Sequence, residues 1–157
     1  MSAPRVLVIG YGNPARGDDG LGPALAERLE QLGLRGVTVE ADYQLSIEHA
    51  ALAAEHDVVV FADATTRGDA PFTLARLSPE DCDTFTSHAV SPAQVLHLAA
   101  TCFGAAPKGY VLAIRGRALD GFSEGLSAPA RAGLEAALDH LTGFIGTSRW
   151  ETDDARR

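Results

Sequence analysis

The sequence predicts a single-domain α/β fold, a three-layer α/β/α sandwich around a mostly parallel, twisted sheet of about five strands. Short apolar segments alternate with longer helical patterns, which is typical of βαβ units. The segments at 5–10, 58–62 and 110–115 are almost wholly apolar, as expected for strands covered on both faces. A length of 157 residues fits one domain. We assign residues 1–146 to this domain and 147–157 to a polar C-terminal tail.

Glycine, proline and serine mark most of the expected element boundaries. Ser91 is expected to cap a helix that has Pro92 at its first position. No helical pattern separates the strand at 72–77 from the strand before it, so this strand is expected to be antiparallel or at an edge. The other expected elements are a helix at 21–31, a strand at 37–41, a helix at 46–55, the end of the Ser91 helix near 102, and a last helix at 127–145.

Composition excludes several functional classes. Thirteen Lys and Arg against 21 Asp and Glu give a net charge of −8, and no basic stripe is present to bind nucleic acid. No apolar run approaches the roughly 18–20 residues of a membrane span, and the N-terminal residues lack the order of a signal peptide. Cys82 and Cys102 form no CxxC pattern, which favours a reduced setting. We therefore expect a cytoplasmic protein.

In open α/β sheets, ligands bind beyond the carboxyl ends of the strands, and three loops leave such ends, at 11–20, 63–68 and 116–125. The first loop carries GYGN and then RGDDG. A dinucleotide fingerprint would need glycine where Ala15 stands, and the adjacent Asp18 and Asp19 would repel a phosphate. A simpler interpretation of these acids is that one of them caps the helix that follows.

Two further residues stand at the expected strand and helix boundaries. Asp63 follows the apolar run VVVFA, and a charged side chain there must pair, cap or bind, although it could also accept hydrogen bonds in a turn with Thr65 or Thr66. His88 precedes the helix capped by Ser91, where a single histidine is most often an ordinary surface residue. The remaining histidines are expected at surface or boundary positions: His49, His56, His97 and His140.

Together, Asp19, Asp63 and His88 form a set of two oxygen ligands and one nitrogen ligand. This set suits a borderline divalent metal such as nickel, zinc or manganese, and three protein ligands leave coordination positions open. The sequence contains neither HExxH nor the GxSxG of a serine hydrolase. Cys82 lies among acidic residues that disfavour a thiolate, and Cys102 is expected to pack in the core. A nucleophilic Ser or Cys is therefore not expected.

Four segments resemble the motifs of the hydrogenase maturation endopeptidases. VLVIGYGNPARGDDGLG resembles the N-terminal signature of that family, and FADATTRGDAP is similar to its second motif. TSHAVSPAQVL resembles the third motif, a histidine shortly before a helix, and AIRGRALDGFSEGLS resembles the late strand and the loop before the last helix. The resemblance extends over residues 5–145. It implies an enzyme that removes a C-terminal extension from the large-subunit precursor of a [NiFe] hydrogenase after nickel insertion.

The same resemblance assigns roles to individual residues. The metal-binding positions of the family correspond to Asp19, Asp63 and His88, and in several relatives the first of these is Glu. The cut lies close behind the last metal-binding Cys of the precursor, so the resemblance implies that nickel is supplied by the substrate and that no nucleotide is needed. Residues expected to shape and orient the first loop are Gly12, Asn13 and Asp18.

The three metal-binding residues are also the catalytic candidates. In one mechanism, the nickel or a water bound to it acts on the scissile carbonyl while an aspartate accepts the proton. The expected partner is the precursor, with no nucleic acid or membrane, and the expected state is a monomer. Two alternatives remain, a nucleotide- or flavin-binding module on a similar sheet and a non-catalytic chaperone that holds the metal-loaded precursor.

Overall fold

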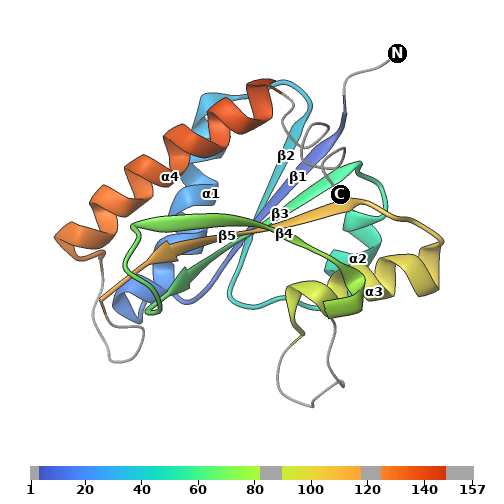
Figure 1. Ribbon diagram of the computed structural model, residues 1–157, viewed down its shortest axis with the longest axis horizontal. Coiled ribbons are helices and arrows are strands. Elements are labelled where there is room, and N and C mark those ends of the chain that lie inside the picture. The colour runs from blue at the N-terminus through green and yellow to red at the C-terminus, as the bar shows by residue number, and fades with distance from the viewer. Residues whose placement is uncertain (1–3, 82–89, 118–124, 148–157) are drawn as a thin grey trace.

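A computed structural model of the chain describes residues 4–81, 90–117 and 125–147, and these form one sheet flanked by helices (Figure 1). The sheet order is β2-β1-β3-β5-β4. β1, β2, β3 and β5 are parallel, and β4 pairs antiparallel with β5 at an edge. The predicted α/β fold, with its mostly parallel five-stranded sheet, is confirmed. The strands are β1 (Val6–Tyr11), β2 (Val37–Asp42), β3 (Val58–Thr65), β4 (Phe72–Leu77) and β5 (Lys108–Arg115).

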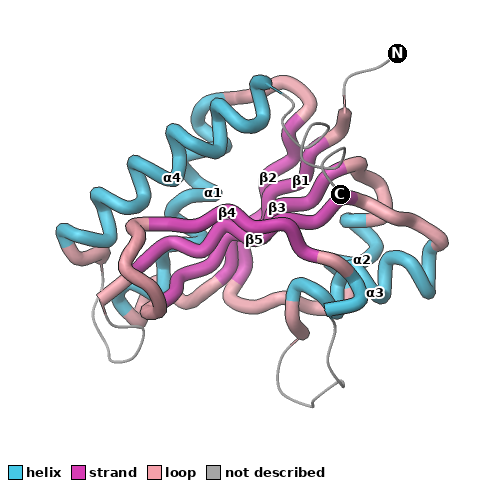
Figure 2. Tube along the Cα trace, viewed as in Figure 1, coloured by secondary structure: helices cyan, strands magenta, loops and turns pink. Residues whose placement is uncertain are grey.

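Helices cover both faces of the sheet (Figure 2). α1 (Leu21–Leu32) and α4 (Ala128–Thr147) pack on one face, and α2 (Glu48–Ala53) and α3 (Pro92–Phe103) pack on the other. Alternate residues of β3 enter the two apolar clusters, because successive strand side chains point to opposite faces. This double burial explains why the central strands are apolar without interruption.

The start of α3 follows the sequence prediction closely. Ser91 Oγ accepts a hydrogen bond from the Gln94 backbone N–H at 3.2 Å, and Gln94 Oε1 accepts one from the Ser91 N–H at 2.8 Å. This reciprocal pair is a capping box, with Pro92 at the first helical position where its missing N–H costs nothing. The edge strand at 72–77 and the helix after the first loop also lie where the sequence placed them.

Three boundaries differ from the prediction. β3 continues to Thr65 because it keeps pairing with β5. Asp63 therefore lies within β3, two residues before its end, and not after the strand. The helix predicted at 46–55 is shorter at both ends. α4 ends at Thr147, two residues past the predicted end of the last helix, and residues 148–157 of the predicted tail lie outside the described part of the chain.

The prediction for His49 and His56 was wrong, since these side chains are buried, with exposed fractions of 6% and 7%. His56 Nδ1 lies 2.8 Å from the Leu52 carbonyl oxygen, and its Nε2 lies 3.1 Å from Thr38 Oγ1. His49 Nδ1 accepts a hydrogen bond from the Ser46 N–H at 2.9 Å. Because hydrogen-bond partners satisfy both ring nitrogens of His56 and Nδ1 of His49, burial of these histidines carries little penalty.

The prediction for Cys102 was also wrong, because this thiol is exposed. The inner face of α3 is formed by Val95, Leu96 and Ala99, and Cys102 lies outside that stripe.

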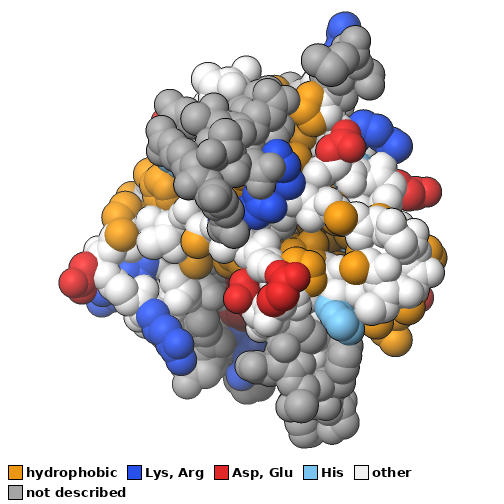
Figure 3. Space-filling view, turned by 45° about the vertical axis from the view of Figure 1, so that its right-hand side comes forward, with side chains coloured by type: hydrophobic (Ala, Val, Ile, Leu, Met, Phe, Trp, Pro, Cys, Tyr) orange, Lys and Arg blue, Asp and Glu red, His pale blue; other side chains and the backbone are white. Residues whose placement is uncertain are grey.

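Charged side chains of both signs are dispersed over the described surface seen in Figure 3. No helix among the described residues is long and apolar enough to cross a membrane.

Candidate functional site

The carboxyl ends of β1, β3 and β5 lie at one edge of the sheet, and two predicted site residues stand there. Asp19 belongs to a short 3₁₀ helix at Gly17–Gly20, and its Oδ2 accepts a hydrogen bond from the Asn13 N–H at 2.8 Å. Asp63 Oδ1 accepts one from the Ala64 N–H, also at 2.8 Å. Both carboxylates are half-buried. Backbone amides thus orient one oxygen of each carboxylate.

The environment of Asp63 raises the pKa of its carboxyl above that of an ordinary aspartate. Burial raises the pKa of this carboxyl most strongly, and the negative charge of Asp19 raises it further. The Tyr11 hydroxyl and the Ala64 N–H oppose this shift and lower the pKa. The net pKa is raised, and Asp19 is near enough for its charge to contribute to that shift.

Tyr11 is a residue of this site that the sequence analysis missed. It is the last residue of β1, and burial followed by the charge of Asp63 raises the pKa of its hydroxyl. The hydroxyl therefore keeps its proton and can donate to the Asp63 carboxylate. Leu7 and Ile9 belong to the apolar cluster under α2 and α3, and Tyr11 packs against it. Strand alternation from Leu7 to Tyr11 was the available signal.

Asp63 lies on this same face of the sheet. Val59 and Phe61, four and two residues earlier in β3, both belong to the cluster under α2 and α3. Val90, which leads into α3, also packs against that cluster. His88 is two residues before Val90 in the sequence but lies outside the described residues. The structure thus places the two acidic candidates and leaves the histidine a prediction.

Within the described ranges, no three His, Cys, Asp or Glu side chains gather into a metal site. The Asp19 and Asp63 pair nevertheless suits a cation on chemical grounds. Two carboxylates in mutual repulsion bind a divalent ion favourably, because its charge removes the repulsion. Each has a second oxygen beyond the one held by a backbone amide, and oxygen donors with one imidazole suit a borderline metal.

Asp18, the neighbour of Asp19, has a different environment. Its side chain is 3% exposed and accepts hydrogen bonds at 2.7 Å from the Arg117 N–H, the Ser127 N–H and the Ser127 hydroxyl. It thereby connects the first loop to the segments on either side of the third loop. The N-cap of α1 is Gly20, without a side-chain cap, so neither aspartate caps that helix.

Glycines of the first loop and of the first turn of α1 have a packing role. A Cβ on Gly22 would lie 2.5 Å from the Ala62 carbonyl oxygen and 2.7 Å from the Tyr11 nitrogen. Gly12 has a φ of 141°, and a Cβ there would overlap the Asp19 carbonyl oxygen. These glycines allow α1 and the 3₁₀ helix to lie directly on the strands, which accounts for a glycine pattern that only superficially resembles a dinucleotide fingerprint.

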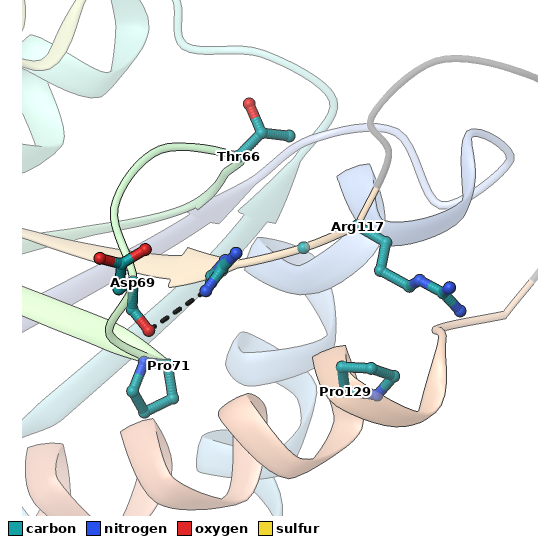
Figure 4. Close-up of a pocket in the computed structure, with 7 residues that line it drawn as sticks. Thr66, Asp69, Pro71, Arg117 and Pro129 are labelled. Atoms are coloured by element: carbon teal, nitrogen blue, oxygen red, sulfur yellow. Dashed lines mark hydrogen bonds between the residues drawn. The ribbon is translucent and has the colours of Figure 1, made fainter.

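Two pockets lie at the carboxyl edge of the sheet. One, of about 250 Å³, adjoins the exposed ring of Tyr43, which follows β2. The other, of about 520 Å³, lies beyond the end of β5, next to the start of α4 (Figure 4). The first pocket is lined by Gly12, Pro14, Pro23, Ala41, Asp42 and Tyr43. The second is lined by Thr66, Asp69, Pro71, Arg115, Gly116, Arg117 and Pro129.

No family model and no curated protein matches the chain by sequence, but solved structures share its fold. The hydrogenase 2 maturation peptidase from a Thaumarchaeota archaeon is 26% identical, with 90% of this chain and 98% of that one covered and a TM-score of 0.69. The hydrogenase maturating endopeptidase HybD from E. coli is also 26% identical, with 92% and 93% covered and a TM-score of 0.72.

A third structure, the [NiFe] hydrogenase maturation protease HycI from Thermococcus kodakarensis, is 20% identical and shows the fold alone, with 93% of this chain and 95% of that one covered and a TM-score of 0.72. The fold and the site define a small α/β protein with an acidic pair beyond the carboxyl ends of parallel strands. Over about nine-tenths of its length, the chain is similar to hydrogenase maturation endopeptidases of known structure.

Proposed function

We propose that this protein is an endopeptidase that removes the C-terminal extension of a [NiFe] hydrogenase large-subunit precursor after nickel insertion. The observation that carries the proposal is the Asp19 and Asp63 pair, oriented by backbone amides at the carboxyl edge of the sheet. The pair belongs to a fold that two peptidases of this kind share over about nine-tenths of the chain.

Nickel is part of the substrate in this proposal. Asp19, Asp63 and His88 are the residues that would meet it, and a precursor without nickel would lack the element that they recognise. A divalent ion supplies Lewis-acid chemistry, because it polarises a carbonyl and makes a bound water more acidic. Cleavage is then restricted to precursors that have already received their metal.

The chain's own residues would orient the substrate and move the proton. The raised pKa of Asp63 makes this carboxylate a better proton acceptor near neutral pH than an ordinary aspartate. The Tyr11 hydroxyl holds it in place from β1. Asp18 keeps the loop that carries Asp19 attached to Arg117 and Ser127.

Surroundings of the pair suit a polypeptide substrate. Tyr43 and Ile47, between β2 and α2, are 70% and 67% exposed and offer apolar contact beside the first loop.

We further propose that the enzyme acts as a monomer in the cytoplasm and needs no nucleotide. A chaperone that binds the loaded precursor without cutting it is the alternative that the experiment must separate.

The test is to incubate the pure protein with nickel-loaded and nickel-free large-subunit precursor and to measure the product mass over time. We expect loss of a C-terminal peptide from the loaded precursor alone. Shortening of both forms would contradict the nickel requirement. Stable binding of the loaded precursor without any shortening would contradict the peptidase and support the chaperone.

A further inference from the structure

The pocket of about 520 Å³ beyond β5 is a built feature of the same sheet edge. Its base is the end of β5, its walls are the loop between β3 and β4 and the first turn of α4, and Arg115 and Arg117 both line it. Figure 4 shows Arg117 above the Pro129 end of α4 and Asp69 on the far side of the pocket. In a protein with a net charge of −8, a pocket with two arginines and one aspartate stands out.

Backbone contacts connect this pocket to the acidic pair. The Gly116 N–H donates to the Thr65 carbonyl oxygen at 2.8 Å, which joins the pocket base to the end of β3, two residues after Asp63. The Arg117 N–H donates to Asp18 Oδ2 at 2.7 Å, next to Asp19. A ligand in the pocket is therefore held at a set position relative to both acids, because the connecting elements are strands and a buried carboxylate.

The Arg115 side chain is oriented within the pocket. Its Nη1 donates to the Asp69 backbone carbonyl oxygen at 3.1 Å, shown as the dashed line in Figure 4. A guanidinium has five N–H groups, so one such bond leaves donors for a ligand. Arginine forks match a carboxylate bidentately, and the positive end of the 20-residue helix α4 adds a favourable field for an anion at the same place.

We propose that this pocket binds a carboxylate of the substrate polypeptide, either an acidic side chain or the terminal carboxylate of the extension that is removed. The inference rests on the proposed function, since it supplies that reaction with a second contact point. A cation site and an anion site on one rigid edge would hold the polypeptide on both sides of the cut. Neither site alone would position the scissile bond.

The first test uses unlabelled, N-acetylated octapeptides of Gly and Ser that carry two Glu or two Gln and end in a free or an amidated carboxyl, with binding followed by isothermal titration calorimetry. We expect the wild-type protein to bind at least one carboxylate-bearing peptide and not the Gln amide, with affinity that falls as salt rises. Binding of the Glu amide identifies a side-chain carboxylate, and binding of the Gln peptide with a free end identifies the terminus. Equal affinity for all four, or no binding at millimolar peptide, overturns the proposal.

The matched variants are the double substitution Arg115→Gln with Arg117→Gln and the control Arg35→Gln. Arg35 is exposed at the opposite end of the sheet, so its substitution lowers the positive charge without touching the pocket. We expect the double variant to lose at least about tenfold in peptide affinity, since two charge-assisted contacts are removed. Unchanged affinity in the double variant, with a native circular dichroism spectrum, overturns the proposal.

Processing of the nickel-loaded precursor separates this inference from the proposed function. If the wild-type protein cuts the precursor, we expect the double variant to raise KM about tenfold with little change in kcat. Cutting with unchanged KM and kcat overturns the pocket and leaves the peptidase standing. If the wild-type protein cuts nothing, the proposed function fails and with it the role of the pocket in that reaction, whatever the peptides do.

Discussion

Two halves of one sheet edge carry opposite charge. Over β1 and β3, Asp19 and Asp63 are half-buried, are held by backbone amides, and repel each other. Beyond β5, Arg115 and Arg117 line a pocket and are exposed to solvent. The acidic half depends on burial, which makes its charges costly and reactive, whereas the basic half depends on exposed guanidinium groups. The comparison suggests a division between chemistry and substrate holding.

Asp18 connects the two halves of this edge through side-chain hydrogen bonds. It lies beside Asp19 in the sequence, yet its hydrogen bonds go to Arg117 and Ser127. Adjacent aspartates thus have separate tasks, one internal and structural and one at the open site. Substitutions at each position should therefore affect different measurements.

The largest effect is expected for Asp63→Asn. Asparagine keeps the shape and can still accept from the Ala64 N–H, but it brings no charge to a metal and accepts no proton. We expect processing of nickel-loaded precursor to fall by at least about a hundredfold, because loss of residues that only support metal ligands already costs roughly 10–100-fold. Product mass against time measures this.

The control for Asp63→Asn is Asp139→Asn, which replaces one carboxylate oxygen of an exposed aspartate on α4 by the same NH2 group. We expect it to process the precursor at the wild-type rate. If Asp63→Asn also kept the wild-type rate, the acidic half would not be the reacting site. The proposed division between chemistry in the acidic half and substrate holding in the basic half would then be wrong.

The second effect is on stability, in Asp18→Ala. This substitution removes the acceptor of three buried or half-buried donors, and each unsatisfied donor costs about 1–3 kcal/mol unless water reaches it. Allowing for partial hydration, we expect the free energy of unfolding in urea to fall by about 3 kcal/mol. Urea unfolding followed by circular dichroism gives the value.

Asp19→Ala is the matched comparison for Asp18→Ala, since it leaves a single backbone donor, the Asn13 N–H, without its partner. We expect a stability loss of about 1 kcal/mol together with loss of processing. Equal stability losses in the two variants would show that the neighbouring aspartates do not differ as their contacts indicate.

The smallest effect is expected in the pH dependence of the free energy of unfolding. Because the pKa of Asp63 is raised in the folded state, the unfolded chain loses this proton first, at its ordinary pKa of about 3.9. The contribution of Asp63 to stability therefore falls as pH rises from that value to the folded pKa and is constant above it.

We expect the stability of Asp63→Asn, relative to wild type in EDTA, to increase across this window. Urea unfolding of both proteins between pH 3.5 and 8, about the accessible range, measures the difference. A constant or decreasing difference would contradict the raised pKa.

Much of the fold could be predicted because local patterns carry it. Unbroken apolar runs require cover on both faces, and Ser91-Pro92 carries its own capping chemistry, so the sheet and α3 follow from short stretches of chain. The end of β3 was placed too early because Asp63 and Thr65 are polar, although pairing with β5 continues through them. Sequence periodicity reports the exposure of side chains and does not report backbone pairing.

The sequence by itself determined the order of strands and helices, the acidic first loop and the polar residue at the end of β3, since each depends on residues close together in the chain. Only the tertiary structure decided that Asp18 meets Arg117 and Ser127, and that Tyr11 faces Asp63. It also decided where the arginine pocket forms. The physical reason is that these contacts join strands whose neighbours in the sheet are not their neighbours in sequence, so no local pattern records them.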